Sequence, residues 1–547
     1  MAIPSLLADA AHRLGLGPDD LIAYGDDKAK VRLSVMERPR QGAAPARLIL
    51  VSAITPTPAG EGKTTTSIGL AQAMEARGQR VCLSLREPSL GPVFGMKGGG
   101  TGGGKSRLEP SAEINLHFNG DLHAVTAAHN LLSALIDNHL HHGGAPDLDP
   151  NRVLWPRVMD MNDRALRDSV LGLGGSSNGV PRQGSFDITA ASEVMAILCL
   201  SSSLADLRLR LGRILVGFTR DRKPVTAADL GAVGAMVALL RDALIPNLVI
   251  TTDGTPALVH GGPFANIAHG CSSVLATRMG LHLADWVITE GGFGMDLGGE
   301  KFLDIKCVGA DLRPAAVVLV ATVRALKLHG GVALKDLNRP DPAAVERGLP
   351  NLMHHLDTIA RFGPPAIVAI NLFPSDTPDE IAVVEAACAA RGVPAAPSAH
   401  FAQGGQGALA LADLVVAHAL ADAPPVRALY DWAAPVIDKI TAVARGAYGA
   451  ADVVLSREAE RDLRRIEALG FDKLPICIAK TQYSLSDDAT QRGRPTGFTL
   501  HVEAIKENTG AGFLVVVTGE MMRMPGLPKK PAAAGVDVVD GRIVGVE

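Results

Sequence analysis

Residues 47–85 read RLILVSAITPTPAGEGKTTTSIGLAQAMEARGQRVCLSL, and this stretch decides the fold. It opens with an apolar, β-branched run from Arg47 to Ile54, which is typical of a buried parallel strand. The segment TPAGEGKT follows at 57–64, then a run with helical periodicity that Gly78 can end, and then a second strand-like run from Val81. Strand, loop, helix and strand in this order predict a P-loop, in which N–H groups at a helix N-terminus face phosphates.

A second segment, GGTGGGKS at 99–106, matches the pattern G-x-x-x-x-G-K-[ST] to the letter, whereas TPAGEGKT has Thr57 in place of the first glycine. Its context is wrong for a P-loop, because no strand-like run precedes it and Pro110 stands where a helix would continue. Lys105 is therefore interpreted as a solvated loop lysine and Lys63 as the phosphate ligand. The predicted nucleotide-binding residues are Thr57, Pro58, Ala59, Gly60, Glu61, Gly62, Lys63 and Thr64.

Composition narrows the class of protein. A chain of 547 residues suggests about three domains. A net charge of -4 argues against a nucleic-acid-binding stripe or a polybasic membrane patch. The six cysteines are scattered without a C-x-x-C pair, which predicts buried thiols in a reduced compartment. No secretory signal is evident and the apolar runs are too short to span a bilayer, so we expect a cytoplasmic protein without nucleic-acid or membrane partners.

Apolar runs that predict parallel strands alternate with helical segments along the chain. This alternation predicts an α/β fold: a large, doubly wound P-loop-type domain with a mostly parallel sheet, plus two smaller α/β domains. The predicted domains are 1–350, with insertions, then 351–450, and a C-terminal α+β unit at 451–547. Further strands are expected from Asn247, Asp285, Val317 and Ala366, and helices from Ala191 and Pro378.

Two groups of polar residues are candidates for chemistry. Arg86 and Glu87 directly follow the second strand, at the sheet edge where α/β proteins bind ligands. A guanidinium fork beside a P-loop suits a second anion such as an acyl phosphate, although a structural pairing of Arg86 with a carboxylate is the alternative. The segment 113–129 concentrates histidines and carboxylates without H-E-x-x-H spacing, which disfavours a transition metal. Asp121 is the first choice as proton acceptor, because a Gly-Asp turn can present it to a pocket.

Two further groups carry weaker signals. Asp296, Glu300, Lys301 and Lys306 follow a strand in a glycine-rich segment and are candidates for steering anions or Mg²⁺. Phe373 lies just past a strand and Phe401 lies ahead of a glycine loop. Two aromatic rings at loop positions can sandwich a flat heterocycle, at about 1–3 kcal/mol by analogy with base stacking. The alternative for each ring is core filling.

Assembled, these segments closely resemble the formate–tetrahydrofolate ligase family, also called formyltetrahydrofolate synthetases. The resemblance extends from near Arg47 to the C-terminus. It implies that ATP phosphorylates formate and that formyl phosphate then formylates tetrahydrofolate, giving 10-formyltetrahydrofolate, ADP and phosphate. The matching runs are TPTPAGEGKTTTSIGL, LREPSLGPVFGMKGG, INLHFNGDLHAVTAAHNLL, VMDMNDRALR, GLGG, HGGPFANIAHGC, ATVRALKLHGG, AKTQYSLSDD and MPGLPKKPA.

The resemblance also implies roles for single residues. Lys63 contacts the ATP phosphates, Thr64 is a partner of Mg²⁺, Arg86 lies near formyl phosphate, and Phe373 forms one side of the folate-stacking pair in the 351–450 unit. Phe401 stands where the family commonly has tryptophan, so the second stacking face is smaller here. Members are typically homotetramers that a monovalent cation such as K⁺ or NH₄⁺ activates.

Two other classes of protein share part of this pattern. A switch ATPase of the partitioning type also has a similar loop and helix, but its signature lysine is missing where Pro58 and Ala59 stand. An ATP-regulated binding or scaffold protein would explain the loop but neither Phe373 nor Phe401. Formate-dependent ADP release in the presence of tetrahydrofolate separates the three.

Overall fold

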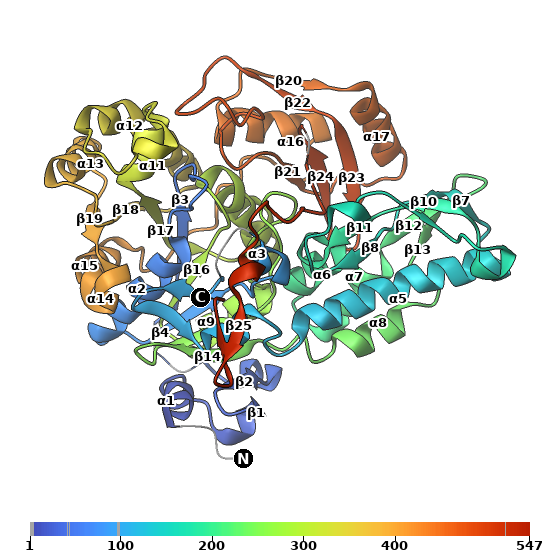
Figure 1. Cartoon of the computed structure of the whole chain (residues 1–547), viewed down its shortest axis with the longest axis horizontal. Helices are drawn as coiled ribbons and strands as arrows, with labels where there is room; N and C mark the ends of the chain where they lie inside the picture. The colour runs from blue at the N-terminus through green and yellow to red at the C-terminus, as the bar shows by residue number, and fades with distance from the viewer. Residues whose placement is uncertain (1–4, 41, 43, 96–98, 520, 547) are drawn as a thin grey trace.

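The computed structural model describes residues 5–40, 42, 44–95, 99–519 and 521–546. Its centre is a sheet of 12 strands flanked by helices (Figure 1). The neighbours from β15 to β19 all run parallel, while β1, β2 and β14 form an antiparallel edge. The main strand order is β1 (Leu21–Tyr24), β2 (Lys28–Val31), β14 (Asn247–Thr251), β15 (Pro256–Val259), β4 (Val81–Leu85), β16 (Trp286–Glu290), β3 (Arg47–Ala53), β17 (Pro314–Ala321), β18 (Ala366–Asn371) and β19 (Ala395–Ser398). The prediction of a mixed α/β fold with a large, mostly parallel sheet is confirmed.

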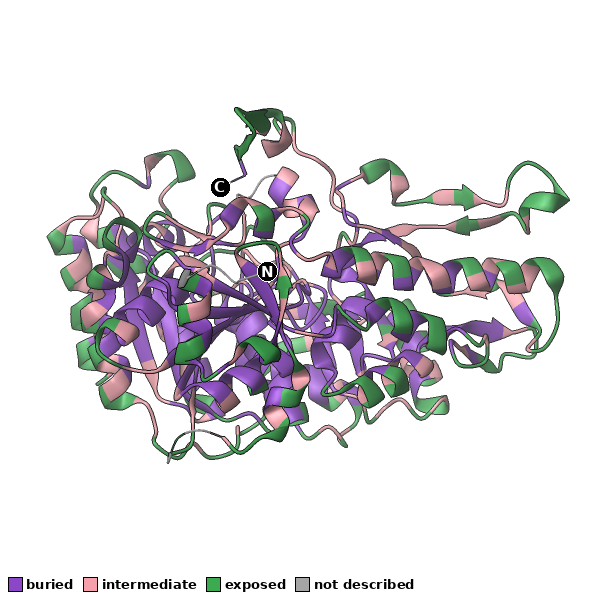
Figure 2. Cartoon of the chain, turned by 90° about the horizontal axis from the view of Figure 1, so that it is seen from below, coloured by how far each residue is buried: buried purple, intermediate pink, exposed green. Residues whose placement is uncertain are grey.

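Both faces of this sheet are buried, which explains why its strands read as continuous apolar runs. In β3, Ile49 and Val51 join the core beneath α2 (Lys63–Ala76) and α15 (Leu409–His418). Leu48 and Leu50 point to the opposite face and join the core that contains α12 (Pro342–Phe362). Figure 2 shows the buried residues concentrated in this central layer.

An elongated unit built from residues between α5 and α8 extends from one side of the sheet (Figure 1). It contains α5 (Asp121–His142), α6 (Glu193–Leu200), α7 (Leu204–Gly212), α8 (Val233–Leu240) and short strands including β9 (Ser169–Leu171) and β10 (Arg182–Gly184). The helical stretch expected from Ala191 is two helices. The break follows because Ser203 caps α7, accepting a 3.1 Å hydrogen bond from the Asp206 amide.

The C-terminal unit has its own core, to which Ile440, Tyr448 and Leu514 contribute. It comprises α16 (Val436–Val443), α17 (Arg457–Ala468), β20 (Asp452–Leu455), β21 (Ile476–Ala479), β22 (Thr499–Val502), β23 (Ala504–Asn508) and β24 (Phe513–Val517). Strands β18 and β19 instead hydrogen-bond into the large sheet through β17. The boundaries of the three domains stay a prediction.

All six cysteines are buried and free, as the sequence predicts. Within the described part of the chain, no helix combines the length and apolar character needed to cross a membrane.

Candidate functional site

The glycine loop, residues 57–64, joins the carboxyl end of β3 to the first turn of α2. Gly60 and Gly62 have φ values of +80° and +74°, in the left-handed region that favours glycine. A Cβ atom on Gly62 would lie 2.6 Å from Nδ2 of Asn371, the last residue of β18. Asn371 Nδ2 donates a 3.0 Å hydrogen bond to the Glu61 carbonyl. The loop is therefore held close to the end of β18, and only glycine fits at that contact.

The Glu61 side chain holds the glycine loop in place through hydrogen bonds. Its carboxylate is buried and accepts a 2.6 Å hydrogen bond from the Thr57 amide and a second bond from the Thr322 hydroxyl. Thr322 is the N-cap of α11 (Val323–His329), and His329 at the other end of that helix lies 2.8 Å from the Thr55 carbonyl. Helix α11 thus contacts both sides of the loop.

Glu290 connects the loop to the predicted anion-binding arginine. It ends β16, between β3 and β4, and it is buried. Its Oε2 accepts a 2.8 Å hydrogen bond from the Thr64 hydroxyl, and its Oε1 lies 3.6 Å from Arg86 Nη2. Arg86 also donates to the Pro263 carbonyl at 3.3 Å. Arg86 therefore pairs with Glu290 and not with its neighbour Glu87, and its guanidinium lies one carboxylate away from the loop.

Glu87 is buried beside Arg86 but points elsewhere. Its Oε2 has no hydrogen-bond partner among the described residues. Burial, with the carboxylates of Asp121 and Asp160 nearby, raises the pKa of Glu87 well above its usual range, and Lys30 acts against that shift. Asp160 fixes the chain that follows, because it accepts a 2.6 Å hydrogen bond from the Ser89 hydroxyl.

Asp121 lies in a buried ion pair. It is the first residue of α5, and Lys30 Nζ lies 2.8 and 3.0 Å from its two oxygens. Asn247 Nδ2 donates a further 2.7 Å hydrogen bond to Oδ2. Lys30 and Asn247 thus occupy both oxygens of the Asp121 carboxylate. The role of Asp121 as proton acceptor remains a prediction.

The histidines of the 113–129 segment do not converge on one point. His117 and His123 stack on each other with ring centroids 4.8 Å apart, whereas His129 is buried against Trp155 at 4.1 Å. Burial lowers the pKa of His129 to about 3, so its imidazole is neutral at pH 7. Among the residues that the structure describes, no group of three or more His, Cys, Asp or Glu could hold a metal ion.

Phe373 and Phe401 follow the neighbouring strands β18 and β19, at the same sheet edge as the glycine loop. The Phe373 amide donates a 2.9 Å hydrogen bond to Asp376, which forms the turn after β18. Phe401 is 57% exposed and follows His400, whose Nε2 lies 3.2 Å from the Thr66 hydroxyl of α2. An aromatic side chain exposed at a ligand-binding edge is available for stacking.

The second glycine segment is a β-hairpin, β5 (Gly102–Gly103) and β6 (Ser106–Glu109), with Lys105 in its turn. It lacks the strand-to-helix geometry of a P-loop despite its match to the sequence pattern, and this supports the interpretation of that match as accidental. The Lys105 amide donates a 2.9 Å hydrogen bond to the Phe401 carbonyl. A Cβ atom on Gly104 would lie 2.1 Å from that same carbonyl, so these glycines allow the hairpin to pack on Phe401.

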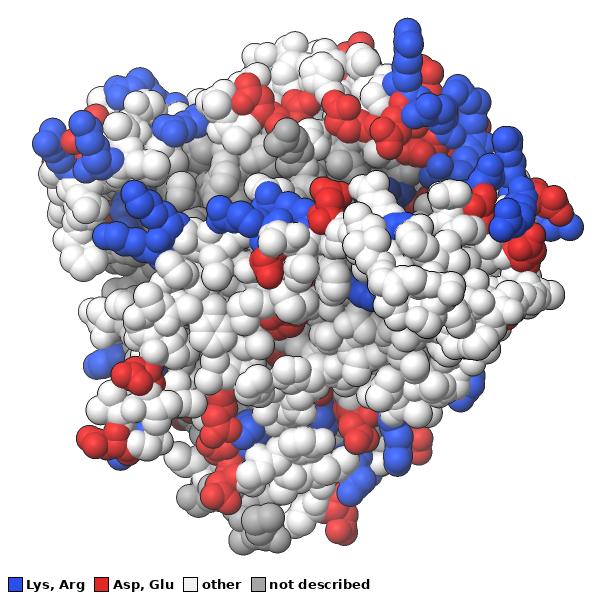
Figure 3. Space-filling model, turned by 45° about the vertical axis from the view of Figure 1, so that its right-hand side comes forward, with Lys and Arg blue, Asp and Glu red and all other residues white. Residues whose placement is uncertain are grey.

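Charged side chains of both signs lie on the upper part of the face shown in Figure 3, where Lys and Arg are interspersed with Asp and Glu.

Comparison with known proteins agrees with this geometry. A family profile described as formate–tetrahydrofolate ligase matches residues 2–547. The formate–tetrahydrofolate ligase of Myxococcus xanthus is 55% identical over 544 residues, covering 99% of this chain and 98% of that protein. The chain belongs to the formate–tetrahydrofolate ligase family. The same-named protein of a Nocardioides species is 54% identical over 547 residues, with 98% and 96% covered, and that of Symbiobacterium thermophilum is 55% identical over 543 residues, with 99% and 97% covered.

In this ligase the charged residues of the glycine-rich segment after β16 lie in the core. Asp296, Glu300, Lys301 and Lys306 are all at most 1% exposed. Asp296 pairs with Lys480 at 2.9 Å, and Lys301 donates to the Ala265 carbonyl at 2.6 Å. A role of these four residues in steering anions or Mg²⁺ stays a prediction, and their burial means that it would not be exercised at the exposed surface.

Sequence reasoning missed three residues that contact the predicted site residues. Glu290 and Asn371 each end a parallel strand, and this position is the signal that could have found them. Arg324 lies on α11 with its guanidinium carbon 3.6 Å from the centroid of the Phe373 ring. No local pattern marks it, since the contact joins segments that are 49 residues apart (373 − 324).

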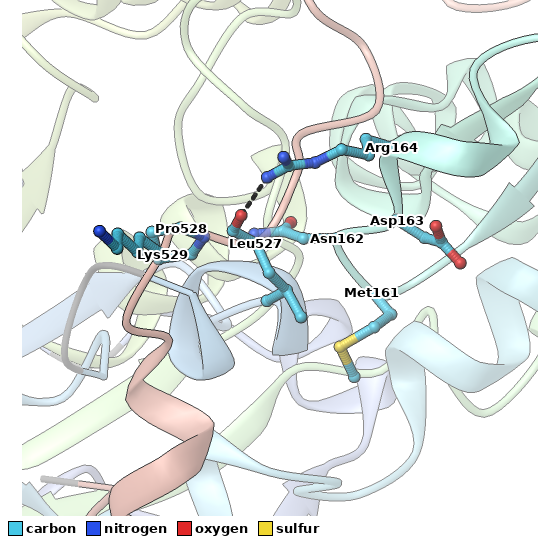
Figure 4. Close-up of a pocket in the computed structure, with 7 residues that line it drawn as sticks. All are labelled: Met161, Asn162, Asp163, Arg164, Leu527, Pro528 and Lys529. Carbon is cyan, nitrogen blue, oxygen red and sulfur yellow. Dashed lines mark hydrogen bonds between the residues drawn. The ribbon is translucent and has the colours of Figure 1, made fainter.

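A separate cavity of about 740 Å³ lies between residues 161–164 of the elongated unit and residues 527–529 near the C-terminus (Figure 4). Arg164 donates to the Leu527 carbonyl across it. Asn162 Nδ2 donates a 3.0 Å hydrogen bond to the Gly91 carbonyl of α3 (Leu90–Phe94), which ties the cavity to the chain after Arg86. The predicted site residues do not line this cavity; its lining is Met161, Asn162, Asp163, Arg164, Leu527, Pro528 and Lys529.

Proposed function

We propose that this chain joins formate to tetrahydrofolate through formyl phosphate, giving 10-formyltetrahydrofolate, ADP and phosphate. One observation carries the proposal. The glycine loop, Arg86 and the two aromatic loops all follow parallel strands and meet at one sheet edge. The family match over residues 2–547 supports the same reaction. The strand, loop and helix order and the helices on both sheet faces favour a doubly wound P-loop fold.

The first step transfers the γ-phosphoryl group of ATP. A formate oxygen attacks the γ-phosphorus, the bond to the β,γ-bridging oxygen breaks, and ADP leaves. In this proposal the α2 N-terminus and Lys63 stabilise the charge that develops on the phosphate oxygens. Arg86 is connected to the loop through Glu290, which accepts the Thr64 hydroxyl, and its planar guanidinium would bind the acyl phosphate group of formyl phosphate.

Mg²⁺ fits beside the loop. The Thr64 hydroxyl and the Glu290 carboxylate are oxygen ligands 2.8 Å apart, and oxygen is what Mg²⁺ prefers. When bound, the ion neutralises phosphate charge. We therefore propose that Thr64 and Glu290 together would hold Mg²⁺.

A monovalent cation fits at Glu87. Its buried carboxylate has an oxygen without a hydrogen-bond partner among the described residues, and a cation such as K⁺ or NH₄⁺ would satisfy it. Lys30 already pairs with Asp121. A cation at Glu87 would favour the ionised carboxylate, whose pKa burial raises well above its usual range.

The second step passes the formyl group to tetrahydrofolate. With the pterin ring held by Phe373 and Phe401, N10 attacks the formyl carbon and the carbon–oxygen bond to phosphate breaks. The N10 proton goes to the leaving phosphate, which departs as hydrogen phosphate. We do not assign this proton to Asp121, because Lys30 and Asn247 hold its carboxylate.

We also propose a homotetramer. The hairpin formed by β9 and β10 reaches away from the body of the chain (Figure 2). Its apolar side chains are exposed, with Val170 61% and Leu173 64% accessible. A second copy of the chain would cover this surface. Leu173→Asp should lower the molar mass measured by light scattering on a sizing column, and an unchanged mass would exclude the hairpin as a contact.

The reaction is tested with purified protein, Mg-ATP, formate and tetrahydrofolate. We expect ADP release that requires formate, and a folate product that acid converts to the absorbing methenyl form. Formate-independent ADP release without folate product would indicate the switch ATPase instead. Absence of folate product at saturating substrates would refute the proposal.

A further inference from the structure

Arg324 covers one face of the Phe373 ring. Its guanidinium carbon lies 3.6 Å from the ring centroid, which is the distance of a stacked cation–π contact. Arg324 is only partly exposed, and Phe373 is likewise half-buried. Because Phe373 is not fully buried, part of its ring is accessible beside the guanidinium.

Helix α11 fixes Arg324 relative to the glycine loop. The helix begins at Thr322, whose hydroxyl donates to Glu61, and ends at His329, which contacts the Thr55 carbonyl at 2.8 Å. Arg324 is the second residue of this helix. Its backbone position is thus set by two contacts with the phosphate-binding segment, at opposite ends of α11.

The same helix fixes the loop that carries Phe373. Lys327 lies one turn after Arg324 and therefore shares its face of α11. Its ammonium group is fully buried and pairs with Glu380 at 2.9 Å. Glu380 also closes the capping box at Thr377, the N-cap of α13 (Pro378–Ala390). The segment from Phe373 to Glu380 is therefore attached to α11 by a stacked guanidinium at one end and a buried ion pair at the other.

A guanidinium on one ring face affects the opposite face. It restricts rotation of the ring about its side-chain bonds, and its charge attracts the electrons of the ring toward itself. An electron-rich heterocycle such as a tetrahydropterin then stacks more favourably on the free face, because the repulsion between the two π-systems is smaller. The result is a stack of three layers: guanidinium, phenyl and substrate ring.

We propose that Arg324 is a positioning residue for tetrahydrofolate, acting through Phe373. This rests on the proposed function, in which Phe373 contacts the pterin. Arg324 itself touches no reacting atom. It keeps Phe373 in the orientation that the pterin requires and couples that orientation to the glycine loop through α11.

The test is a double-mutant cycle of Arg324→Ala and Phe373→Ala, assayed at saturating Mg-ATP and formate. Arg324→Ala should raise the KM for tetrahydrofolate roughly 2- to 30-fold, the range of a cation–π contact of about 0.5–2 kcal/mol, with kcat changed less than 2-fold. Phe373→Ala should raise it further, and adding Arg324→Ala to that variant should have no additional effect. Arg324→Lys should recover part of the loss, since it keeps the charge but not the plane. Arg339→Ala is the control, because that side chain is 82% exposed.

The possible outcomes distinguish a failure of the role proposed for Arg324 from a failure of the proposed reaction. A raised KM with Phe373→Ala but a normal KM with Arg324→Ala would overturn the role of Arg324 alone. Additive effects in the cycle would also overturn it, as would a lower melting temperature of Arg324→Ala without a change in KM. A normal KM with Phe373→Ala would remove Phe373 from the folate site and the inference with it, while formate-dependent product formation would still stand.

Discussion

Glu290→Gln should impair phosphoryl transfer while leaving the fold intact. The carboxylate is buried, accepts the Thr64 hydroxyl at 2.8 Å and lies 3.6 Å from Arg86. The glutamine amide keeps the shape of the glutamate side chain and can still accept one hydrogen bond. It lacks the negative charge that attracts the Arg86 guanidinium. The Thr64 hydroxyl then donates to a neutral oxygen in place of a charged one. A hydrogen bond to a charged group contributes about 1.5–3 kcal/mol, which corresponds to roughly a 10- to 150-fold loss of turnover.

The assay is formate-dependent ADP release as a function of Mg²⁺ concentration. We expect a lower kcat together with a higher Mg²⁺ requirement, because the variant loses an anionic oxygen ligand. Asp285→Asn is the matched control. It also removes a carboxylate that pairs with arginines, Arg40 at 2.8 Å and Arg80 at 3.0 Å, but at the opposite end of β16. Wild-type kcat and Mg²⁺ dependence in Glu290→Gln would refute the assignment of Glu290 to the phosphate site.

Three further predictions address the remaining site residues. Lys63→Met should raise the activation free energy of turnover by about 2.7–4 kcal/mol. Lys105→Met, in the hairpin turn, should change turnover only several-fold. A larger effect of Lys105→Met than of Lys63→Met would show that the wrong loop was chosen. Phe401→Trp should lower the KM for tetrahydrofolate but not for formate, and a lower melting temperature with unchanged KM would place Phe401 outside the site. His400 is neutral when folded because burial lowers its pKa from 6.5 to about 4, so stability should fall as pH drops through this interval. In denaturant titrations, the free energy of unfolding should fall between pH 7 and pH 5 by about 2 kcal/mol less in His400→Gln than in the wild type. An equal fall in both proteins would contradict this.

The sequence predicted those parts of the fold in which the local pattern of apolar residues matches the residues that are buried in the folded protein. The strand at β3 and the helix after it were found because both faces of the sheet are buried, so the apolar run has no interruption. The segment 99–106 was not predicted to be a strand, loop and helix, because no strand-like run precedes it and Pro110 follows it, and the structure has a hairpin there. The break between α6 and α7 was missed, because a capping serine inside an apolar periodic segment is a small signal.

The site was predicted where residues directly follow strands, and missed where a contact depends on packing between distant segments. Arg86 and Phe373 were predicted as site residues from their strand-end positions, and their roles stay predictions. The burial of Asp121 against Lys30 was not predicted, because Lys30 lies in β2, 91 residues away. A Gly-Asp turn looks the same in sequence whether it faces a pocket or an ammonium group.

Helix α11 shows why connectivity matters more than any single contact here. Its N-cap bonds to Glu61, its last residue contacts Thr55, and Arg324 and Lys327, one turn apart, contact Phe373 and Glu380. Each of these contacts alone joins only two residues. Together they place the glycine loop and the loop after β18 against one short helix, so that the two predicted binding regions share a single support.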